Sequence, residues 1–218
     1  MRVAFVHTVG FLVEMFRERA AAELPGADCF HILNESLLQD LLRGVPKPLV
    51  YRRVVGQIML AADAGADLIA VTCSSTSPAV DAARPLLAQP VLKIDDAMMA
   101  EAARTGRRVG LLCTATSTVE PSSALLAAYA AAEGRAVQVI PRVEAAAYAA
   151  LLQGDRAQHD AIVGVAARRL AAKVDVLVLA QASLARLRDD IAAAVPCPVL
   201  ASPAMLMREI ADRLRPTA

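Results

Sequence analysis

The sequence predicts an α/β protein made of two pseudo-symmetric units, each built on a parallel sheet. Short, uniformly apolar runs alternate with longer alanine-rich stretches that carry spaced charges. Blocks of the chain recur about 108 residues apart, and small polar residues follow the apolar runs abruptly. Runs that are apolar at every position suit strands buried on both faces, and helical connections between them indicate right-handed βαβ units.

The repeat consists of three blocks that recur in the same order. Residues 66–75 align with 174–183, and residues 89–92 align with 197–200, both at an offset of 108. Residues 2–8 align with 108–114 at an offset of 106. We therefore expect two flavodoxin-like units, at residues 1–96 and 106–202, with a C-terminal helix at 203–218 that can pack back on the first.

The elements follow in order along the chain. The apolar run 3–6 is short and meets His7, so we interpret it as a first buried strand and not as a signal peptide. Asp96 and Ser122 are residue types that start helices, and Gly65, Gly106 and Gly134 are of a type that ends them. The helical pattern predicts helices at 12–24, 50–64, 78–87, 96–104, 122–133, 159–173 and 204–214.

Composition and charge exclude several classes of function. Hydrophobic residues make up 56% of the chain but aromatics only 3%, so the core must be aliphatic. No run approaches the roughly 18 apolar residues of a membrane span. The net charge is +1 and the charges are dispersed, which is unlike the basic, aromatic-rich surface of a nucleic-acid-binding protein. We expect a cytoplasmic protein that binds neither nucleic acid nor membranes.

Polar residues gather where the predicted strands end. Each strand passes directly into small polar residues, at 7–8, 73–76, 113–118 and 181–183. In parallel α/β sheets, ligands bind outside the carboxyl ends of the strands. If the two units face each other, all four loops line one cleft, and we expect the active site there.

Cys73 is the strongest catalytic candidate. Its thiol follows a buried strand, precedes Ser74, Ser75 and Thr76, and lies just before a helix that opens near Pro78. The N–H groups of a helix start bind carboxylates and lower the pKa of a nearby thiol. The alternative is a buried, inert cysteine that acts as a small hydrophobic residue.

The remaining candidates are weaker. Hydroxyls and free amides could hold a carboxylate in the second loop, although helix capping would also explain them. His7 could orient a substrate or donate a proton, or it could be structural. We interpret His159 as solvated surface, and Cys29 and Cys197 as core residues. The hydroxyl-bearing candidates for substrate binding outside the Cys73 loop are Thr114, Thr116, Ser117, Thr118 and Ser183.

These blocks resemble the aspartate/glutamate/hydantoin racemase superfamily, whose members include arylmalonate decarboxylase and maleate isomerase. The resemblance covers nearly the whole chain and rests on the repeat, the 67–75 block, the 109–114 strand with Thr118, and the 175–179 strand. It implies an enzyme without metal or organic cofactor, in which one cysteine from each half flanks the substrate. It also implies a small carboxylate substrate and a homodimer, for which the helices at 122–133 and 143–152 offer apolar faces.

Carried over by position, Cys73 matches the first catalytic cysteine, whereas the second position holds Gln181. Glutamine is neither a base nor an ordinary acid near neutral pH. Cys113 or His7 could supply the second proton, Cys73 could act alone as in a decarboxylase, or Cys73 could be a nucleophile as in the isomerase branch. In each case we expect Gln181 to donate an amide N–H to a substrate oxygen.

We therefore predict proton transfer next to the carboxylate of a small acid or amino acid, with Cys73 as acid and base. A single-cysteine decarboxylase or cis–trans isomerase is one alternative. A carboxylate-binding protein that has lost its chemistry is another. A nucleotide-binding protein is disfavoured, since neither GxGxxG nor GK[ST] is present.

Overall fold

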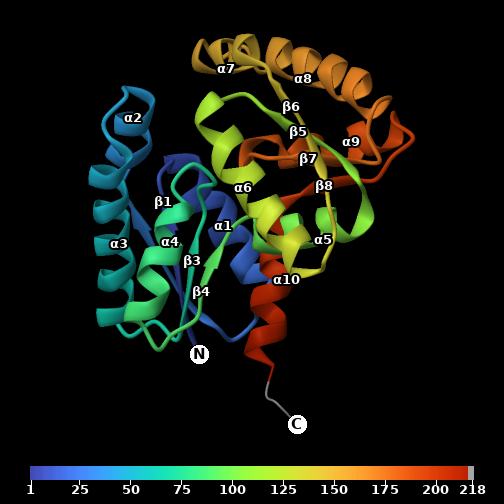
Figure 1. Cartoon of the computed structure of the whole chain (residues 1–218). Coiled ribbons are helices and arrows are strands. Elements are labelled where there is room, and N and C mark those ends of the chain that lie inside the picture. Colours follow the sequence, from blue (N-terminus) through green and yellow to red (C-terminus); the bar gives the residue numbers. More distant parts are fainter. Residues whose placement is uncertain (216–218) are drawn as a thin grey trace. The chain divides into compact units, whose positions relative to one another are not determined.

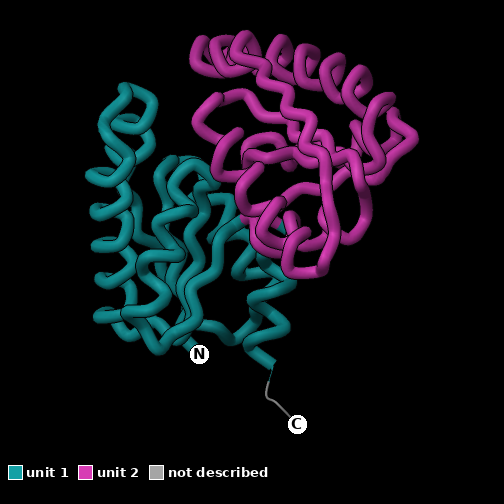
Figure 2. The backbone as a smooth tube through the Cα atoms, in the orientation of Figure 1, with its two compact units in different colours: residues 1–94, 204–218 teal, residues 95–203 magenta. Residues whose placement is uncertain are grey.

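The chain divides into two compact units, which Figure 2 shows in different colours. The computed structural model describes residues 1–215. Unit 1 contains residues 1–94 together with the C-terminal segment that begins at 204, and unit 2 contains residues 95–203. Each unit is built around its own four-stranded parallel sheet, which confirms the predicted α/β class.

Unit 1 has the strand order β2-β1-β3-β4. Its strands are β1 (Arg2–His7), β2 (Asp28–Leu33), β3 (Leu68–Val71) and β4 (Val91–Lys93). Its helices are α1 (Gly10–Glu23), α2 (Ser36–Leu42), α3 (Lys47–Asp63), α4 (Pro78–Ala83), the 3₁₀ turn η1 (Arg84–Leu86) and α10 (Ser202–Leu214), which starts two residues before the unit boundary. In Figure 1, α3 and α4 lie on the opposite side of this sheet from α1.

The two faces of the unit 1 sheet are buried against different residue types. Ala4, Val6, Ile69 and Val71 pack into an aliphatic cluster with the buried positions of α2, α3 and α4. On the other face, Phe5 packs against aromatic rings, including Phe16 of α1. The aromatic side chains of unit 1 are divided between the two faces, since Phe30 and Tyr51 pack against the aliphatic cluster.

Unit 2 repeats the architecture, with the strand order β6-β5-β7-β8. Its strands are β5 (Arg108–Cys113), β6 (Gln138–Val143), β7 (Val176–Leu179) and β8 (Val199–Ala201). Its helices are α5 (Asp96–Thr105), the 3₁₀ turn η2 (Thr116–Thr118), α6 (Val119–Ala132), α7 (Ala145–Leu152), α8 (Arg156–Ala171), the 3₁₀ segment η3 (Ala182–Leu187) and α9 (Arg188–Ala193).

The strands reproduce the offsets of the sequence repeat. β3 and β7 are 108 positions apart, as are β4 and β8, whereas β1 and β5 are 106 apart. The two sheets also have the same order, with the first strand of each unit between its second and third. The repeat found in the sequence is therefore a repeat of structure.

An aspartate just before the third strand of each unit links that strand to the first by hydrogen bonds. Asp67 accepts a hydrogen bond from the Arg2 N–H at 2.6 Å, and its own N–H donates to the Arg2 carbonyl at 2.8 Å. Asp175 makes the same pair of contacts with Arg108, both at 2.8 Å. The N–H donation from Arg108 lowers the pKa of Asp175 below its ordinary value. Each aspartate thus helps to define the register of two parallel strands.

The predicted helices are found with shifted ends. Asp96 begins α5 as expected, but α6 begins at Val119 and not at Ser122, because η2 leads directly into it and extends it by most of a turn. Gly65 and Gly134 have φ angles of +82° and +64° after their helices, whereas Gly106 is extended. In the predicted C-terminal helix 203–218, residues 216–218 lie outside the described residues, and α10 ends at Leu214.

Three smaller predictions are wrong. Cys29 and Cys197 are only half-buried, because Cys29 is on the edge strand β2 and Cys197 lies in the turn before the edge strand β8, where it packs against the margin of the unit 2 core. His159 is 1% exposed and not on the surface, because it lies on the stripe of α8 that includes Val163, Ala167 and Leu170.

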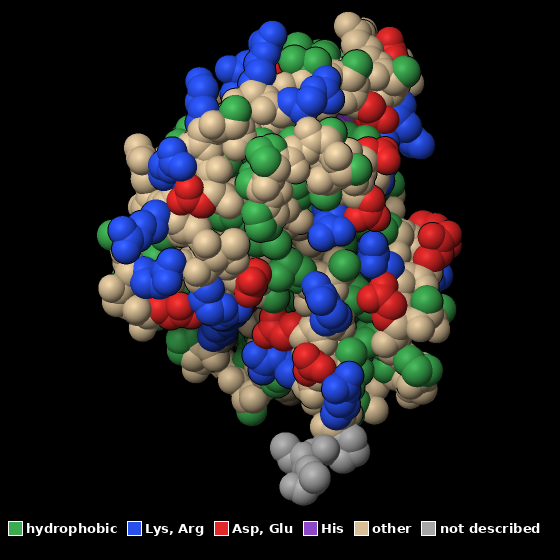
Figure 3. Space-filling model, turned by 90° about the vertical axis from the view of Figure 1, so that its right-hand side faces the viewer, with side chains coloured by type: hydrophobic (Ala, Val, Ile, Leu, Met, Phe, Trp, Pro, Cys, Tyr) green, Lys and Arg blue, Asp and Glu red, His purple; other side chains and the backbone are tan. Residues whose placement is uncertain are grey.

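Charged side chains of both signs are interspersed on the surface drawn in Figure 3. Lys and Arg side chains there alternate with Asp and Glu and do not merge into one basic stripe. Within residues 1–215, no helix combines the length and the apolar character that crossing a membrane requires.

Gly110 provides a test of the packing of α8 on the unit 2 sheet. A Cβ at this position would lie 2.9 Å from Leu170 Cγ and 3.2 Å from Val174 Cγ2. We expect Gly110→Ala to lower the free energy of unfolding by about 1–3 kcal/mol, because the added methyl group overpacks this contact. Urea denaturation followed by circular dichroism measures the change.

Gly56→Ala is the matched control. Gly56 lies within α3, and nothing comes within 4 Å of an added Cβ. This substitution should stabilise the protein by up to about 1 kcal/mol, since alanine favours helix over glycine. Equal stabilities for Gly110→Ala and the wild type would contradict the described packing of α8.

Candidate functional site

The Cys73 turn, defined as residues 73–77, follows β3 directly. The Thr76 N–H and Oγ1 both donate to the Cys73 carbonyl, at 3.2 and 3.3 Å. The Ser77 N–H and Oγ donate to the Ser74 carbonyl in the same way, at 3.4 and 3.0 Å. These paired bonds fold the chain tightly before α4 begins. In the resulting turn, Cys73 is buried, with 8% of its surface exposed.

The substrate-binding candidates in this turn are largely buried. Ser74 is 7% exposed and Ser75 is 5% exposed. Neither residue is without a partner in the protein. The turn therefore places one thiol and two hydroxyls in a sheltered position at the carboxyl end of β3.

His7 lies in the interior of unit 1, fully buried at the end of β1. Its Nδ1 is hydrogen-bonded to Thr72 Oγ1 at 2.7 Å, and its Nε2 to His31 Nδ1 at 2.9 Å. The ring is also tilted against Phe16, with 5.7 Å between centroids. Because both nitrogens bond to protein groups, His7 does not present a free nitrogen to a ligand, and any part it takes in the site is indirect.

The two histidines that bond to each other are shifted toward the neutral form. Burial, with a smaller contribution from the charge of His31, lowers the pKa of His7 from 6.5 to about 3. Burial and then the charge of Arg17 lower the pKa of His31, against an opposing effect of Glu14. At neutral pH both rings are uncharged, so each is both donor and acceptor.

In unit 2, Gln181 and Thr114 lie side by side at the ends of β7 and β5. The Gln181 Oε1 accepts from the Thr114 N–H at 2.5 Å and from its Oγ1 at 2.9 Å. Two of the residues predicted for the site are thus brought together. Since the oxygen of the carboxamide is engaged, Gln181 would contact a ligand through its Nε2 amino group as a donor. Both donors of Thr114 are used within the protein.

The other hydroxyls of unit 2 differ in exposure. Thr116 is exposed and Ser117 half-buried, whereas Thr118, the last residue of η2, is 1% exposed. Ser183 is half-buried in η3. The hydroxyl-rich loop is therefore a 3₁₀ turn with only part of its polar surface accessible.

Cys113 is a poor candidate for a second acid or base. It is the last residue of β5 and is fully buried. Burial raises the pKa of its thiol to about 11, although a backbone N–H from Ala115 opposes the shift. A thiol with that pKa is almost entirely protonated at neutral pH, so it is a weak source of thiolate.

A polar cluster that was not predicted from the sequence links η3 to α8. Arg186 of η3 binds Asp160 of α8 in a bidentate pair, and His159 Nδ1 lies 2.7 Å from Asp160 Oδ1. The hydrogen bonds from Arg186 lower the pKa of Asp160. The spacing of His159 and Val163 on one helix face could have indicated that this histidine is buried. The cluster anchors the segment that follows Gln181.

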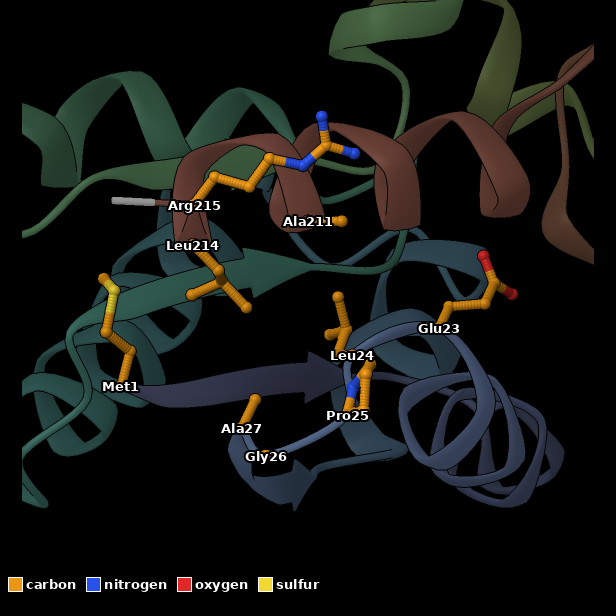
Figure 4. Close-up of a pocket in the computed structure, with 9 residues that line it drawn as sticks. All are labelled: Met1, Glu23, Leu24, Pro25, Gly26, Ala27, Ala211, Leu214 and Arg215. Carbon is orange, nitrogen blue, oxygen red and sulfur yellow. The ribbon is translucent and has the colours of Figure 1, made fainter. Parts of the chain in front are cut away.

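A hollow elsewhere in unit 1 lacks the chemistry of these loops. It lies at the opposite end of β1 from His7, where Met1 and the loop after α1 face the last turn of α10 (Figure 4). Its lining is apolar apart from Glu23 and Arg215, and it holds no Cys, Ser, Thr or His. Within residues 1–215, no group of three or more His, Cys, Asp and Glu side chains is arranged to hold a metal ion.

The buried histidine makes stability depend on pH. Between pH 6.5 and about 3, the unfolded chain binds a proton at His7 that the folded chain does not bind. The free energy of unfolding should therefore fall as the pH falls through this range, by up to roughly 1.4 kcal/mol per pH unit from this residue. Urea unfolding of the wild type and of His7→Asn across this range isolates the effect. Parallel curves for the two proteins would contradict it.

Comparison with known proteins agrees with this architecture. No curated protein matches the chain in sequence. Among solved structures, it is similar to glutamate racemase from Thermus thermophilus in complex with β-chloro-D-alanine, at 21% identity and a TM-score of 0.72, covering 98% of this chain and 80% of that one. It is also similar to allantoin racemase from Klebsiella pneumoniae, at 20% identity and a TM-score of 0.68, covering 98% and 87%.

A third similar structure is a mutant of arylmalonate decarboxylase in a sulfate-associated form, at 17% identity and a TM-score of 0.62, covering 98% and 93%. At these identities, the likeness establishes the fold. The family model for Asp/Glu/hydantoin racemase matches residues 8–210, which is nearly the whole chain. The chain therefore belongs to the Asp/Glu/hydantoin racemase family.

Proposed function

We propose that this protein catalyses cofactor-independent proton transfer at the carbon next to the carboxylate of a small acid. The thiolate of Cys73 takes the α-proton and becomes a thiol, which leaves the substrate as an enediolate-like intermediate. Return of the proton from the thiol to the carbon completes the cycle. The observation that carries the proposal is the sheltered turn in which Cys73 stands beside Ser74 and Ser75.

Gln181 has the second role in the proposal. Its carboxamide oxygen is held by Thr114, so the amide N–H groups are the end left to donate to a ligand. A donor oriented in this way stabilises negative charge that develops on a carboxylate oxygen in the transition state. Glutamine cannot itself exchange protons with carbon near neutral pH.

The other possible proton donors are less suitable than Cys73. Cys113 is fully buried with a pKa raised to about 11, and both ring nitrogens of His7 are bonded to protein groups. Chemistry with a single thiol is therefore favoured over two-cysteine racemisation. A thiol that approaches from one side should return the proton to the face it came from.

A decarboxylase is the second candidate function, and the same observation favours it. A reaction in which carbon dioxide leaves and one thiol protonates the resulting enediolate needs a single cysteine. Among the similar structures is a form of arylmalonate decarboxylase. An isomerase that uses Cys73 as a nucleophile would also need only one thiol.

We extend the proposal to a homodimer in the cytoplasm, with α6 and α7 as candidate interface helices.

Deuterium exchange tests the proton transfer. Incubating small carboxylic and amino acids with the enzyme in deuterated water should replace the α-hydrogen, which NMR detects. Cys73→Ala should slow the exchange by about 10²–10⁴-fold, the usual contribution of an acid–base group. Cys197→Ser, which changes a half-buried thiol of unit 2, should leave the rate unchanged.

Each outcome separates the candidates. Loss of carbon dioxide from a malonate, abolished by Cys73→Ala, identifies the decarboxylase. Binding of a carboxylate without exchange or decarboxylation identifies a non-catalytic binder. Exchange that persists undiminished in Cys73→Ala would rule out the assigned role of Cys73.

Substitution at position 181 tests the single-thiol proposal. Wild-type enzyme should exchange the α-hydrogen with retention of configuration. Gln181→Cys should add racemisation, because it supplies an acid–base group at the position that the resemblance assigns to the second cysteine. Chiral chromatography of the recovered acid measures this. Racemisation by the wild type at the rate of exchange would contradict the proposal.

Gln181→Glu separates the oxygen from the N–H groups. Its carboxylate can still accept from Thr114, but it has no N–H to donate. We expect kcat to fall by about 10²–10³-fold, the typical cost of losing one oxyanion donor. Retention of wild-type kcat would show that Gln181 only positions Thr114.

A further inference from the structure

Thr72, His7 and His31 of unit 1 form a continuous series of side-chain hydrogen bonds that ends at the residue before Cys73. It runs from Thr72 Oγ1 to His7 at 2.7 Å and from His7 to His31 at 2.9 Å. Thr72 is 1% exposed and His7 fully buried, whereas His31 is half-buried on the edge strand β2. The series thus connects the residue before Cys73 with the margin of the sheet.

The rings are held by packing as well as by hydrogen bonds. The His7 and His31 rings stack with 5.2 Å between centroids, and His31 also stacks on Phe5 at 5.3 Å. Phe16 of α1 closes the group against Phe5 at 5.3 Å. Phe5 and Phe16, two of the few aromatic residues in this sequence, thus pack against the two histidines.

Thr72 is the last residue that the sheet holds before the turn. Its N–H donates to the Val6 carbonyl at 3.0 Å, and its Oγ1 donates to the same carbonyl at 3.1 Å. With that hydroxyl proton committed, His7 Nδ1–H donates to Thr72 Oγ1, and His7 Nε2 accepts from His31 Nδ1–H. The donor and acceptor of each of these hydrogen bonds are then determined. The Thr72 hydroxyl donates to the Val6 carbonyl and accepts from His7, so two bonds hold its side chain.

We propose that His7 is a positioning residue for the Cys73 thiol. It fixes Thr72 through Nδ1, while His31 fixes the His7 ring through Nε2. Cys73 leaves the sheet immediately after Thr72, so the direction in which its side chain points depends on where Thr72 is held. The catalytic consequence rests on the proposed function, whereas the effect on the thiol itself does not.

The charged groups near these hydrogen bonds leave this arrangement intact at neutral pH. Arg17 and Glu14, both on α1, are the charged residues whose fields act on His31, with opposite signs. Phe5 and Phe16 contribute only apolar surface. Of the three hydrogen-bonded residues, His31 is therefore the one that is partly exposed to solvent and affected by these charges.

Two substitutions of His7 separate its two hydrogen bonds. The polar atoms of an asparagine side chain occupy about the position of Nδ1, and those of glutamine about the position of Nε2. His7→Asn therefore keeps the bond to Thr72 and loses the bond to His31. His7→Gln keeps the bond to His31 and loses the bond to Thr72, which is the one that matters for Cys73.

The primary measurement is the rate at which iodoacetamide alkylates Cys73, determined by mass spectrometry of its peptide and compared with Cys197 in the same sample. Cys73 is nearly buried, so a loosened turn should expose it and raise its alkylation rate. We expect His7→Gln to raise that rate by about tenfold and His7→Asn by much less, in line with the loss or retention of a buried hydrogen bond. The rate at Cys197 should not change.

If the enzyme shows α-hydrogen exchange, the same variants should affect kcat in the opposite direction. His7→Gln should lower kcat by about tenfold with little change in KM, because the thiol is misplaced and not removed. The alkylation of Cys73 is measured without substrate, so it tests the positioning role alone. If the alkylation rates follow the expected pattern but no acid shows α-hydrogen exchange, the proposed function is refuted and the positioning role stands.

Equal alkylation rates in the wild type and His7→Gln, or equal effects of the Asn and Gln substitutions, would overturn the proposal. If the His7 variants fail to fold, Thr72→Val and Thr72→Ser decide it. Valine keeps the shape of threonine and loses the hydroxyl, whereas serine keeps the hydroxyl. Faster alkylation in Thr72→Val with rescue in Thr72→Ser supports the role of Thr72, and identical rates in both refute it.

Discussion

The parallel pairing of the first and third strands is the constraint on which both units depend. It puts the residues that end these strands next to each other, and in each unit the outcome is a side-chain hydrogen bond just beyond the sheet. In unit 1 that bond joins His7 to Thr72, and in unit 2 it joins Thr114 to Gln181. The aspartate that precedes each third strand, Asp67 or Asp175, helps to hold this pairing in register. The polar loops are therefore positioned by backbone pairing first and by side-chain contacts second.

Most of the framework could be predicted because it depends on periodicity that is visible in the chain. The offsets of 106 and 108 between the blocks are the offsets between the strands, since each apolar run is a strand buried on both faces. Helix ends were less predictable. The η2 turn leads into α6 without a capping side chain, so nothing in the polar sequence before Ser122 distinguishes the end of the turn from the start of the helix.

The partners of the polar side chains could not be predicted from the sequence, because they depend on neighbours that are distant in the chain. His7 and Thr72 are 65 positions apart, and Thr114 and Gln181 are 67 apart. The sequence shows that each lies at a strand end, but not that His7 turns inward to His31 while Gln181 turns its oxygen to Thr114. The prediction for His159 failed for a different reason, since its polar neighbours Asp155 and Asp160 resemble a solvated helix start although its spacing to Val163 places both on the buried face of α8.

Gln181 accepts two hydrogen bonds from Thr114 that a cysteine at this position could not accept in the same way. A cysteine at position 181 has no carbonyl oxygen, so the N–H and Oγ1 of Thr114 would be free to bind a carboxylate. With glutamine, both of those donors bond to the carboxamide oxygen, so only the N–H groups of the carboxamide remain as donors for the proposed ligand contact. Under the proposed function, Gln181 would therefore act as an amide donor and not as an acid. In the proposed reaction, proton transfer then depends on Cys73 alone, and the hydrogen bonds that hold Thr72 help to set the orientation of that thiol.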